Sequence, residues 1–342
     1  MSDQAIVTGE ASSSNPLAVV TGGNGFLGSH LCAVLAAQGW RVRSLSRRGA
    51  PSPCAPEARG QVEYVAVDIM DFDEFNSASE GADAIFHLAG RVSRDPEDSG
   101  ALHALHVQGT KHFIRVVEQR EIKQALYLST SGVVAVSKDT KPLNEKAPYA
   151  RDIISDWGYY LSKLYAEEEV MRACERGLPI KIARPSLLLG PGDPTGQSHE
   201  DLLLFLGDQL KAVPPGGINA VDVRDVAAFL PTLLERGEAG VGYLLGGDSL
   251  TTRAFINQIA QIVDRPAPLF DLPSKMTKKA MGPLKWISKT TLGGGIDPQT
   301  FEMACHYWYV DSALAESIGF KARPLSSTLL DALRDLEERG FY

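Results

Sequence analysis

Residues 21–28 read TGGNGFLG and stand between the β-branched run Leu17–Thr21 and an amphipathic stretch from Leu27 to Gln38. Glycines at a strand-to-helix turn let the backbone approach a pyrophosphate closely, and the free N–H groups of the helix then face the anion. The stretch therefore predicts a dinucleotide-binding turn, with a tight turn that binds no ligand as the alternative. The glycines fit two overlapping frames, Gly23-x-Gly25-x-x-Gly28 and Gly22-x-x-Gly25-x-x-Gly28.

Outward from this turn, short apolar runs alternate with longer amphipathic stretches, which is the pattern of repeated β–α units around a parallel sheet. Helices are expected near residues 27–38, 98–119 and 156–176. Because parallel crossovers are right-handed, these units predict a doubly wound Rossmann fold that binds ligands at the carboxyl ends of its strands. The six expected strands are Leu17–Thr21, Val42–Leu45, Val62–Val67, Ala84–Leu88, Ala125–Leu128 and Ile180–Ala183.

Beyond Pro185 the pattern loosens, with Pro- and Gly-rich stretches at residues 190–192, 214–217 and 293–295. We expect a dinucleotide-binding domain over residues 17–185 and a smaller, mainly substrate-binding lobe over residues 186–342. Parts of 219–263 are expected to complete the first domain, with helices near Arg224–Glu235 and Thr251–Val263 and a strand near Tyr243–Leu245. Residues 1–16 contain acidic residues and no apolar core, so we expect a flexible leader and not a signal peptide.

The composition excludes several classes of protein. The 342 residues are 44% hydrophobic and 22% charged, which is ordinary for a globular chain and not for a collagenous, coiled-coil or disordered one. A net charge of −8 disfavours nucleic acid as a partner. No apolar run approaches the ~18 residues that a bilayer span needs. Four cysteines without C-x-x-C spacing suit a reducing compartment, so a cytoplasmic location is expected.

The end of the second expected strand reads Leu45-Ser46-Arg47-Arg48. In dinucleotide folds a carboxylate here, about 20 residues on, binds the ribose 2′-hydroxyl of NAD, whereas an arginine accommodates the 2′-phosphate of NADP. No acid is present, and the Arg47 guanidinium can bind a phosphate through two N–H groups. NADP(H) is therefore favoured over NAD(H), with an exposed basic loop as the alternative.

Further contacts with a dinucleotide are expected after the next two strands. Asp68 either accepts a hydrogen bond from the adenine amino group or caps the following helix. Leu88 and Ala89 are followed by Gly90, and such small residues let a cofactor pass close to the backbone. His87 is expected to be a packed strand residue and not a ligand.

Tyr159 and Lys163 are four residues apart and therefore share one face of a helix. An ammonium beside a phenol lowers a pKa that is ordinarily about 10, which would suit tyrosine to acid–base chemistry. The spacing alone is common, and it gains weight from the dinucleotide turn upstream. Ser131, after the fifth expected strand, is placed to hold the same carbonyl oxygen, although hydroxyls at a strand end also serve as turn caps.

Four motifs together resemble the extended short-chain dehydrogenase/reductase family over about residues 17–336. The resemblance implies that Ser131 positions a substrate carbonyl, that Tyr159 transfers the proton, and that Lys163 binds the nicotinamide ribose and tunes the tyrosine. It also implies cofactor contacts by Phe26, Leu27, Asp68, Ile69, Pro185 and Ser186. The motifs are TGGNGFLG (21–28), LSTSG (128–132), YYLSK (159–163) and RPSLLLGPGD (184–193).

Within this family, Pro185-Ser186 stands where nucleotide-sugar epimerases and dehydratases usually carry an aromatic residue and an asparagine. The pattern resembles the branch of dihydroflavonol reductases and 3β-hydroxysteroid dehydrogenases, and also that of hopanoid-associated sugar epimerases. Residues 246–251 and 307–311 resemble the same branch. His106 departs from the family, which often has asparagine there, so the usual helix kink or proton relay is left open at this position.

We therefore expect an NADPH-dependent oxidoreductase that reduces a ketone or aldehyde, or oxidises the secondary alcohol, with Tyr159 as general acid or base. A nucleotide-sugar epimerase or dehydratase with tightly bound cofactor is one alternative, against which Pro185-Ser186 argues. An NADP-sensing protein without turnover is another, against which the set of Ser131, Tyr159 and Lys163 argues. The family resemblance also implies a homodimer.

Other features lead to weaker expectations. Arg91, Val133 and Trp157 are expected at the substrate, with core packing as the alternative for Trp157. His103 and His106 lie three apart on a helix without a third ligand, so no metal is expected. Residues Lys275–Lys289 interleave five lysines with apolar residues and predict either a membrane-surface helix or a cover for the second lobe.

Overall fold

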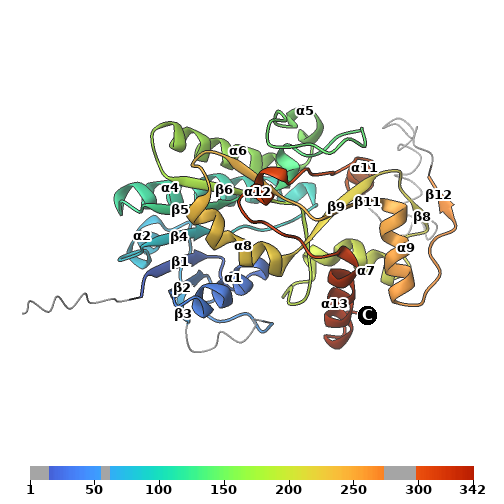
Figure 1. The fold of residues 1–342 in the computed structure, drawn as a ribbon, viewed down its shortest axis with the longest axis horizontal. Coiled ribbons are helices and arrows are strands. Elements are labelled where there is room, and N and C mark those ends of the chain that lie inside the picture. The colour runs from blue at the N-terminus through green and yellow to red at the C-terminus, as the bar shows by residue number, and fades with distance from the viewer. Residues whose placement is uncertain (1–14, 55–61, 273–297) are drawn as a thin grey trace, which may run out of the picture.

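The main sheet of the computed structural model, which describes residues 15–54, 62–272 and 298–342, has seven parallel strands (Figure 1). Their order is β3-β2-β1-β4-β5-β6-β10, so the chain reverses its direction of winding between β1 and β4. This arrangement confirms the doubly wound Rossmann fold, whose ligands bind at such a reversal. The strands are β1 (Leu17–Thr21), β2 (Arg41–Ser46), β3 (Val62–Ala66), β4 (Ala84–His87), β5 (Gln124–Leu128), β6 (Ile180–Pro185) and β10 (Gly242–Leu245).

The six strands expected before Pro185 are all present, and their ends agree within two residues. The seventh strand, β10, comes from much later in the chain and pairs with β6 in parallel, with Gly242 opposite Ile182 and Leu245 opposite Pro185. The strand expected near Tyr243–Leu245 thus forms one edge of the main sheet. The boundary between the two lobes near residue 185 stays a prediction.

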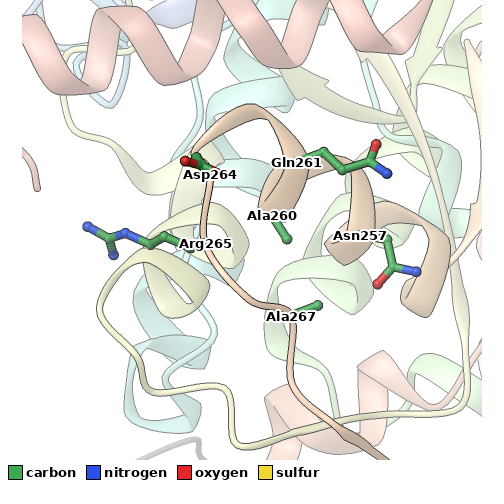
Figure 2. A pocket seen from close by; sticks show the side chains of 6 residues that line it. All are labelled: Asn257, Ala260, Gln261, Asp264, Arg265 and Ala267. Atoms are coloured by element: carbon green, nitrogen blue, oxygen red, sulfur yellow. The ribbon is translucent and has the colours of Figure 1, made fainter.

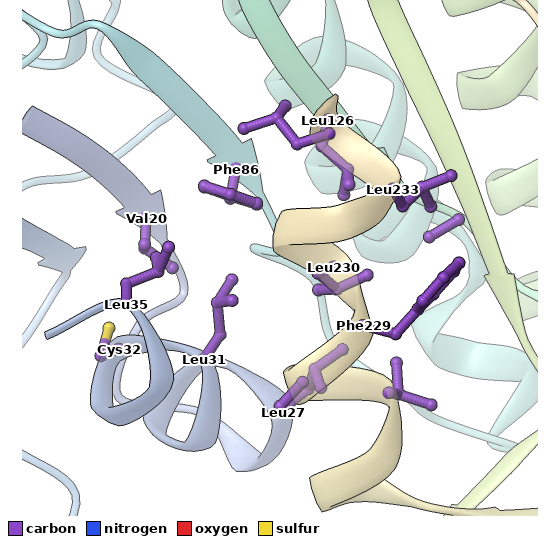
Figure 3. Close-up of a cluster of buried hydrophobic side chains, with 14 of the residues drawn as sticks. Val20, Leu27, Leu31, Cys32, Leu35, Phe86, Leu126, Phe229, Leu230 and Leu233 are labelled. Carbon is purple, nitrogen blue, oxygen red and sulfur yellow. The ribbon is translucent and has the colours of Figure 1, made fainter. Parts of the chain in front are cut away.

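Helices cover both faces of this sheet because alternate residues of each strand point to opposite sides. On one face, α1 (Phe26–Ala37) packs against α8 (Val223–Arg236). Leu31 and Leu230 meet there above Val20 and Phe86 (Figure 3). On the other face, α2 (Phe72–Ala78), α4 (Gly109–Gln119) and α6 (Gly158–Glu175) bury a second cluster that contains Val19 and Phe113.

The helix expected over residues 98–119 is not continuous. It begins with the 3₁₀ turn η1 (Pro96–Asp98) and α3 (Ser99–His103), passes through the π-helical turn η2 (Ala104–Gln108), and continues as α4. The π turn contains His106, so the helix is distorted at the position that the family resemblance left open. Similarly, the helix expected over 156–176 starts at Gly158, after a separate short helix α5 (Arg151–Ile154).

The second lobe contains a three-stranded sheet in the order β11-β9-β7 and a two-stranded one, β12-β8. Its strands are β7 (Leu187–Leu189), β8 (Ala212–Val213), β9 (Gly217–Asp222), β11 (Asp248–Thr251) and β12 (Phe270–Asp271). The three-stranded sheet shares an apolar core with the helices α7 (Glu200–Leu206), α9 (Thr252–Ile262) and α13 (Leu325–Glu338). Figure 1 shows β8 and β12 at the end of the molecule farthest from β1. The short elements are η3 (Ser131–Val133), η4 (Gln197–His199), α11 (Pro298–Ala304) and α12 (Ala313–Ser317).

A polar network joins α8 to α13 where β9 runs into α8. The buried Asp222 caps α8 by accepting a hydrogen bond from the Arg224 backbone N–H (2.8 Å). The same carboxylate binds the Arg224 guanidinium (2.7 Å) and accepts from the Thr328 hydroxyl of α13 (2.9 Å). Arg224 also pairs with Asp331 of α13 (2.7 Å). One carboxylate thus fixes a helix of the main sheet against a helix of the second lobe.

Three expectations fall wholly or largely outside the described residues. They concern the leader at residues 1–16, of which only 15 and 16 are described, the Gly-rich stretch at 293–295 and the stretch Lys275–Lys289. Among the helices that the structure does describe, none has the length and apolarity to cross a bilayer.

His87 of β4 makes the fold sensitive to acid. It is buried, stacks on Phe113 with 4.8 Å between ring centroids, and shares a hydrogen bond with the Thr21 hydroxyl (2.9 Å). The expectation of a packed strand residue is thus confirmed. Burial, aided by the charge of Lys163, lowers the pKa of His87 from 6.5 to about 3.

We therefore expect the free energy of unfolding to fall as the pH drops from 6.5 towards 3, because only the unfolded chain then takes up this proton. One such group contributes a slope of up to about 1.4 kcal/mol per pH unit. In His87→Phe, denaturant unfolding measured across this pH range should show a shallower decline than in the wild type. Equal slopes in the two proteins would contradict this role of His87.

Candidate active site

The glycine-rich turn after β1 leaves the first backbone N–H groups of α1 free. Gly22 has a φ of +69°, and the Gly25 N–H donates to its carbonyl (2.9 Å), so the chain turns sharply into the helix. Gly25 is the N-cap residue of α1, no side chain caps the helix, and its first turn contains no acidic residue. The positive end of the helix dipole is therefore not neutralised, as binding of a pyrophosphate requires.

Close packing also requires glycine in this turn. A Cβ atom on Gly28 would stand 2.1 Å from the Gly22 carbonyl oxygen, and one on Gly22 would stand 2.9 Å from the Ala89 Cα. The Ala89 N–H in turn donates to the Thr21 hydroxyl (3.2 Å). The turn, the start of α1 and the loop after β4, which includes Leu88, thus meet backbone to backbone at the reversal point of the sheet.

The residues expected to select the cofactor follow β2. Arg47 and Arg48 are both exposed in a turn that is closed by a hydrogen bond from the Gly49 N–H to the Ser46 carbonyl (3.2 Å). Neither arginine forms an ion pair with any residue that the structure describes. The guanidinium of Arg47 is therefore accessible to a phosphate.

Asp68 and Ile69 follow β3. The Asp68 carboxylate accepts from the Met70 N–H (3.0 Å), whereas Asp71 caps α2 by accepting from the N–H groups of Asp73 and Glu74. The alternative in which Asp68 caps this helix is therefore wrong, because the cap lies three residues later. A contact between Asp68 and adenine stays a prediction. Ile69 is buried under α4.

Two buried hydroxyl groups at the carboxyl ends of β5 and β6 have no hydrogen-bond partner among the described residues. They belong to Ser129, which follows β5, and Ser186, which follows Pro185 at the end of β6. The Ser129 N–H donates to the Ala183 carbonyl of β6 (2.7 Å), so the two strand ends adjoin. Buried hydroxyls usually have a partner, and two that lack one among the described residues fit a bound polar ligand. Sequence reasoning selected Ser186 but missed Ser129, which is only two residues from Ser131.

The segment with Ser131 packs against the first turn of α6. Ser131 begins η3, is buried, and its hydroxyl forms no hydrogen bond with the described residues. A Cβ atom on the next residue, Gly132, would stand 2.3 Å from the Tyr160 ring. Tyr159 lies beside Tyr160, with 5.0 Å between ring centroids. The fold thus brings Ser131 and Tyr159 to the same edge from segments about thirty residues apart.

The electrostatics of Tyr159 and Lys163 differ from the expectation. Burial raises the pKa of Tyr159 above its ordinary value of 10, and the neighbouring Tyr160 adds to the shift. The Lys163 ammonium donates to the Leu128 carbonyl (2.5 Å) and lies 4.6 Å from the centroid of the Tyr127 ring. Burial lowers the pKa of Lys163 to about 7. The predicted lowering of the tyrosine pKa is therefore wrong in this structure, because desolvation dominates and the ammonium binds a backbone oxygen.

A buried ion pair fixes α6 to the sheet. Glu167, one turn beyond Lys163 on α6, accepts from the Arg184 Nη2 (2.5 Å) and Nε (3.1 Å) of β6. The Tyr149 hydroxyl also donates to this carboxylate (2.8 Å). Neither Glu167 nor Arg184 was selected by sequence reasoning, because their pairing depends on the register of a helix and a strand that are far apart in the pattern.

The residues expected at the substrate are not equally exposed. Val133 and Trp157 are buried together, and the Trp157 ring stacks on that of Trp308 at 5.5 Å. Trp157 is thus packed in the core, which was the alternative to a position at the substrate. Arg91 is exposed and forms an ion pair with Asp98.

Arg94 forms a link between the lobes that sequence reasoning missed. Its guanidinium binds both oxygens of Asp201 on α7, at 2.8 and 3.2 Å. The two residues are 107 positions apart, so no local signal could have shown this contact.

Two hollows on the described part of the chain lie away from these residues. Figure 2 shows the first, of about 340 Å³, at the end of α9. It is lined by Asn257, Ala260, Gln261, Asp264, Arg265 and Ala267. No residue of the candidate site lines either hollow, so we assign them no role. The described residues also contain no group of three potential metal ligands, and His103 is exposed whereas His106 is buried.

Comparisons with known proteins agree with this geometry. The sequence model of the NAD dependent epimerase/dehydratase family matches residues 18–246. A Synechocystis protein provisionally named dihydroflavonol 4-reductase is 28% identical over 94% of this chain and 95% of its own length. Dihydroflavonol 4-reductase of Hordeum vulgare is 26% identical over 81% of this chain and 83% of its own length. The crystal structure of gox2253 has a TM-score of 0.78 at 28% identity, covering 96% of this chain and 99% of that one.

Gly28→Ala should abolish cofactor binding, because the added methyl group would collide with the Gly22 carbonyl and displace the turn. We expect the dissociation constant for NADPH to rise at least about 100-fold, as for the loss of several hydrogen bonds to a charged group. Fluorescence titration measures this, and circular dichroism reports whether the fold persists.

Gly100→Ala is the matched control. This glycine also lies in a helix, but a Cβ atom there would meet no atom within 4 Å. The control should bind NADPH as the wild type does. Unchanged affinity in a folded Gly28→Ala protein would exclude the turn as the pyrophosphate site.

Proposed function

The chain belongs to the NAD dependent epimerase/dehydratase family, and we propose that it is an NADPH-dependent reductase that converts a ketone or aldehyde into an alcohol, or catalyses the reverse oxidation. NAD(P)-dependent oxidoreductase activity follows from the family. One observation supports the choice of residues above all. Tyr159 keeps its proton at neutral pH, on a helix whose first turn packs against the segment that contains Ser131.

The residues at the sheet edge fit a dinucleotide with a 2′-phosphate. Residues 22–28 would hold the pyrophosphate against the uncapped helix, and the exposed Arg47 would bind the 2′-phosphate. Asp68 and Ile69 would contact adenine, and Leu88 and Ala89 would line the backbone path along the cofactor. Pro185 and Ser186, the latter with a buried hydroxyl that lacks a partner among the described residues, would lie beside the nicotinamide. When bound, the cofactor supplies or accepts the hydride.

We propose that Tyr159 donates its phenolic proton to the carbonyl oxygen of the substrate in the reductive direction. The phenol is protonated at neutral pH and can therefore donate, but its raised pKa makes it a weaker acid, so proton transfer requires the Lys163 ammonium to stabilise the phenolate as it forms. The Ser131 hydroxyl, which has no partner among the described residues, would donate to the same oxygen and hold it in place. Lys163, one turn along α6, would stabilise the phenolate left behind and bind the nicotinamide ribose.

The substrate is proposed to be a small or medium carbonyl compound with apolar character. The rings of the buried Trp157 and of the half-buried Tyr160 and Trp308 adjoin Tyr159 and Gly132, so an apolar surface borders the reacting groups. We further propose that residues 17–185, together with α8 and β10, form the cofactor lobe and that the remaining chain mainly shapes the substrate side.

Tyr159→Phe should still bind NADPH but lose about 10²- to 10⁴-fold in the rate of carbonyl reduction, because the proton donor is removed. Loss of NADPH absorbance with a panel of ketones and aldehydes measures the rate. Tyr165→Phe, an exposed tyrosine on the same helix, is the control and should retain full activity. Activity preserved in Tyr159→Phe would refute the proposed acid. Turnover of nucleotide sugars without net loss of cofactor would favour an epimerase instead.

Arg47→Asp should shift the cofactor preference towards NADH, because the carboxylate repels the 2′-phosphate and can accept from the 2′-hydroxyl of NADH. Loss of a charge-assisted contact worth about 1.5–3 kcal/mol corresponds to a fall of about 10- to 100-fold in the NADPH-to-NADH ratio of kcat/KM. Arg41→Asp, an exposed arginine at the opposite end of β2, is the control for net charge. A ratio that stays constant would contradict the assignment of NADP.

A further inference from the structure

We propose that His106 is a positioning residue, locked in the tautomer with the proton on Nδ1, that joins the loop after β4 to the first turn of the catalytic helix α6. This inference rests on the proposed function, which places the cofactor along that loop and the proton donor on that turn. His106 is the position at which the chain departs from the family pattern, and it lies in the π turn η2.

Three hydrogen bonds in series define the link. The Arg91 backbone N–H donates to His106 Nε2 (3.2 Å), and His106 Nδ1 lies 2.8 Å from the Ser162 hydroxyl oxygen. The Ser162 hydroxyl donates to the Tyr159 carbonyl (2.7 Å). This series of hydrogen bonds thus begins and ends on the backbone. It begins at the Arg91 N–H, which can only donate, and ends at the Tyr159 carbonyl, which can only accept.

These two ends fix the direction of every bond between them. Nε2 must be unprotonated, because it accepts from a backbone N–H. The single hydroxyl proton of Ser162 goes to the Tyr159 carbonyl, so Ser162 must accept from Nδ1, which therefore carries the proton. A neutral imidazole satisfies both requirements with one proton, and the opposite tautomer satisfies neither.

The surroundings keep the ring neutral and in place. His106 is 2% exposed, and its ring meets that of Tyr159 edge to face at 5.7 Å. A Cβ atom on Gly90 would stand 3.2 Å from His106 Nε2, so the loop lies directly against the ring. Burial, aided by the charge of Lys163, holds the pKa of His106 well below 6.5.

The link connects the two parts of the site that must be aligned. One end of the loop is held at the glycine turn, through the bond from the Ala89 N–H to the Thr21 hydroxyl, and His106 holds the other end at Arg91. On α6, the bond through Ser162 reaches the backbone of Tyr159 itself. A shift of the loop is therefore transmitted through these hydrogen bonds to Tyr159.

Substitutions at His106 can keep one half of the link at a time. Asparagine places an amide N–H near the position of Nδ1 and can keep the bond to Ser162, but it is too short to reach Arg91. Glutamine places a carbonyl oxygen near the position of Nε2 and can accept from Arg91, but it leaves Ser162 without its donor. Leucine keeps the apolar volume and loses both bonds.

The test measures the dissociation constant for NADPH and the kcat of carbonyl reduction in His106→Asn, His106→Gln and His106→Leu. A lost hydrogen bond of ordinary strength corresponds to about a tenfold effect. We expect about tenfold weaker NADPH binding with near-normal kcat in His106→Asn, and about tenfold lower kcat with near-normal binding in His106→Gln. His106→Leu should show both defects, and His103→Gln, an exposed histidine on the same helical run, neither. Equal losses in the Asn and Gln variants, or a wild-type phenotype in His106→Leu, would overturn the proposal.

A second measurement separates this inference from the proposed function. Nitrogen NMR of histidine-labelled wild-type protein should show one imidazole, absent from His106→Leu, that is protonated at Nδ1 and unprotonated at Nε2. Protonation at Nε2, or averaging between the two tautomers, would overturn the link. This readout and the NADPH affinities need no turnover, so they decide the role of His106 even if no carbonyl compound proves to be a substrate.

Discussion

The contact between Gly22 and Gly28 is the constraint on which the rest of the structure depends. No side chain fits between the carbonyl of one and the α-carbon of the other, and this closeness sets where α1 leaves β1. Once α1 is set, its apolar side packs on α8 and on one face of the sheet, and its uncapped end points to the reversal between β1 and β4. The same close packing that builds the core thus leaves a positive pole exposed at the ligand edge.

Burial is the second organising influence, and it acts in opposite directions on two titratable groups of α6, the Tyr159 phenol and the Lys163 ammonium. A desolvated phenol resists losing its proton, whereas a desolvated ammonium resists keeping one, so the pKa of Tyr159 rises while that of Lys163 falls. The helix that carries both is itself held by a charge pair in the interior, Glu167 with Arg184, which is costly to break once formed. Burial therefore accounts both for the rigid position of α6 and for the shifted pKa values of its side chains.

The fold could be predicted from sequence because strands that are buried on both faces appear as short apolar runs, and the glycine turn identifies the first of these strands. Both ends of β1 follow from that pattern, and the predicted ends of β2 and β5 agree with the structure within one residue. The site was less accessible to such reasoning. The pKa shift of Tyr159 depends on how far burial removes its ring from water. The residue that caps α2 is Asp71 and not Asp68. Arg94 and Asp201 pair across segments that share no sequence pattern. Spacing reveals which residues share a helix face, but not the solvent or partners around them.

The seventh strand, β10, affects how the chain folds during synthesis. β10 covers the outer edge of β6, although more than fifty residues separate them in sequence. On a ribosome, the first six strands emerge well before this edge can be covered, and an uncovered parallel edge is prone to pair with other chains. Completion of the parallel sheet is thus tied to translation of the later half of the chain, and until β10 emerges the edge of β6 stays open to other strands.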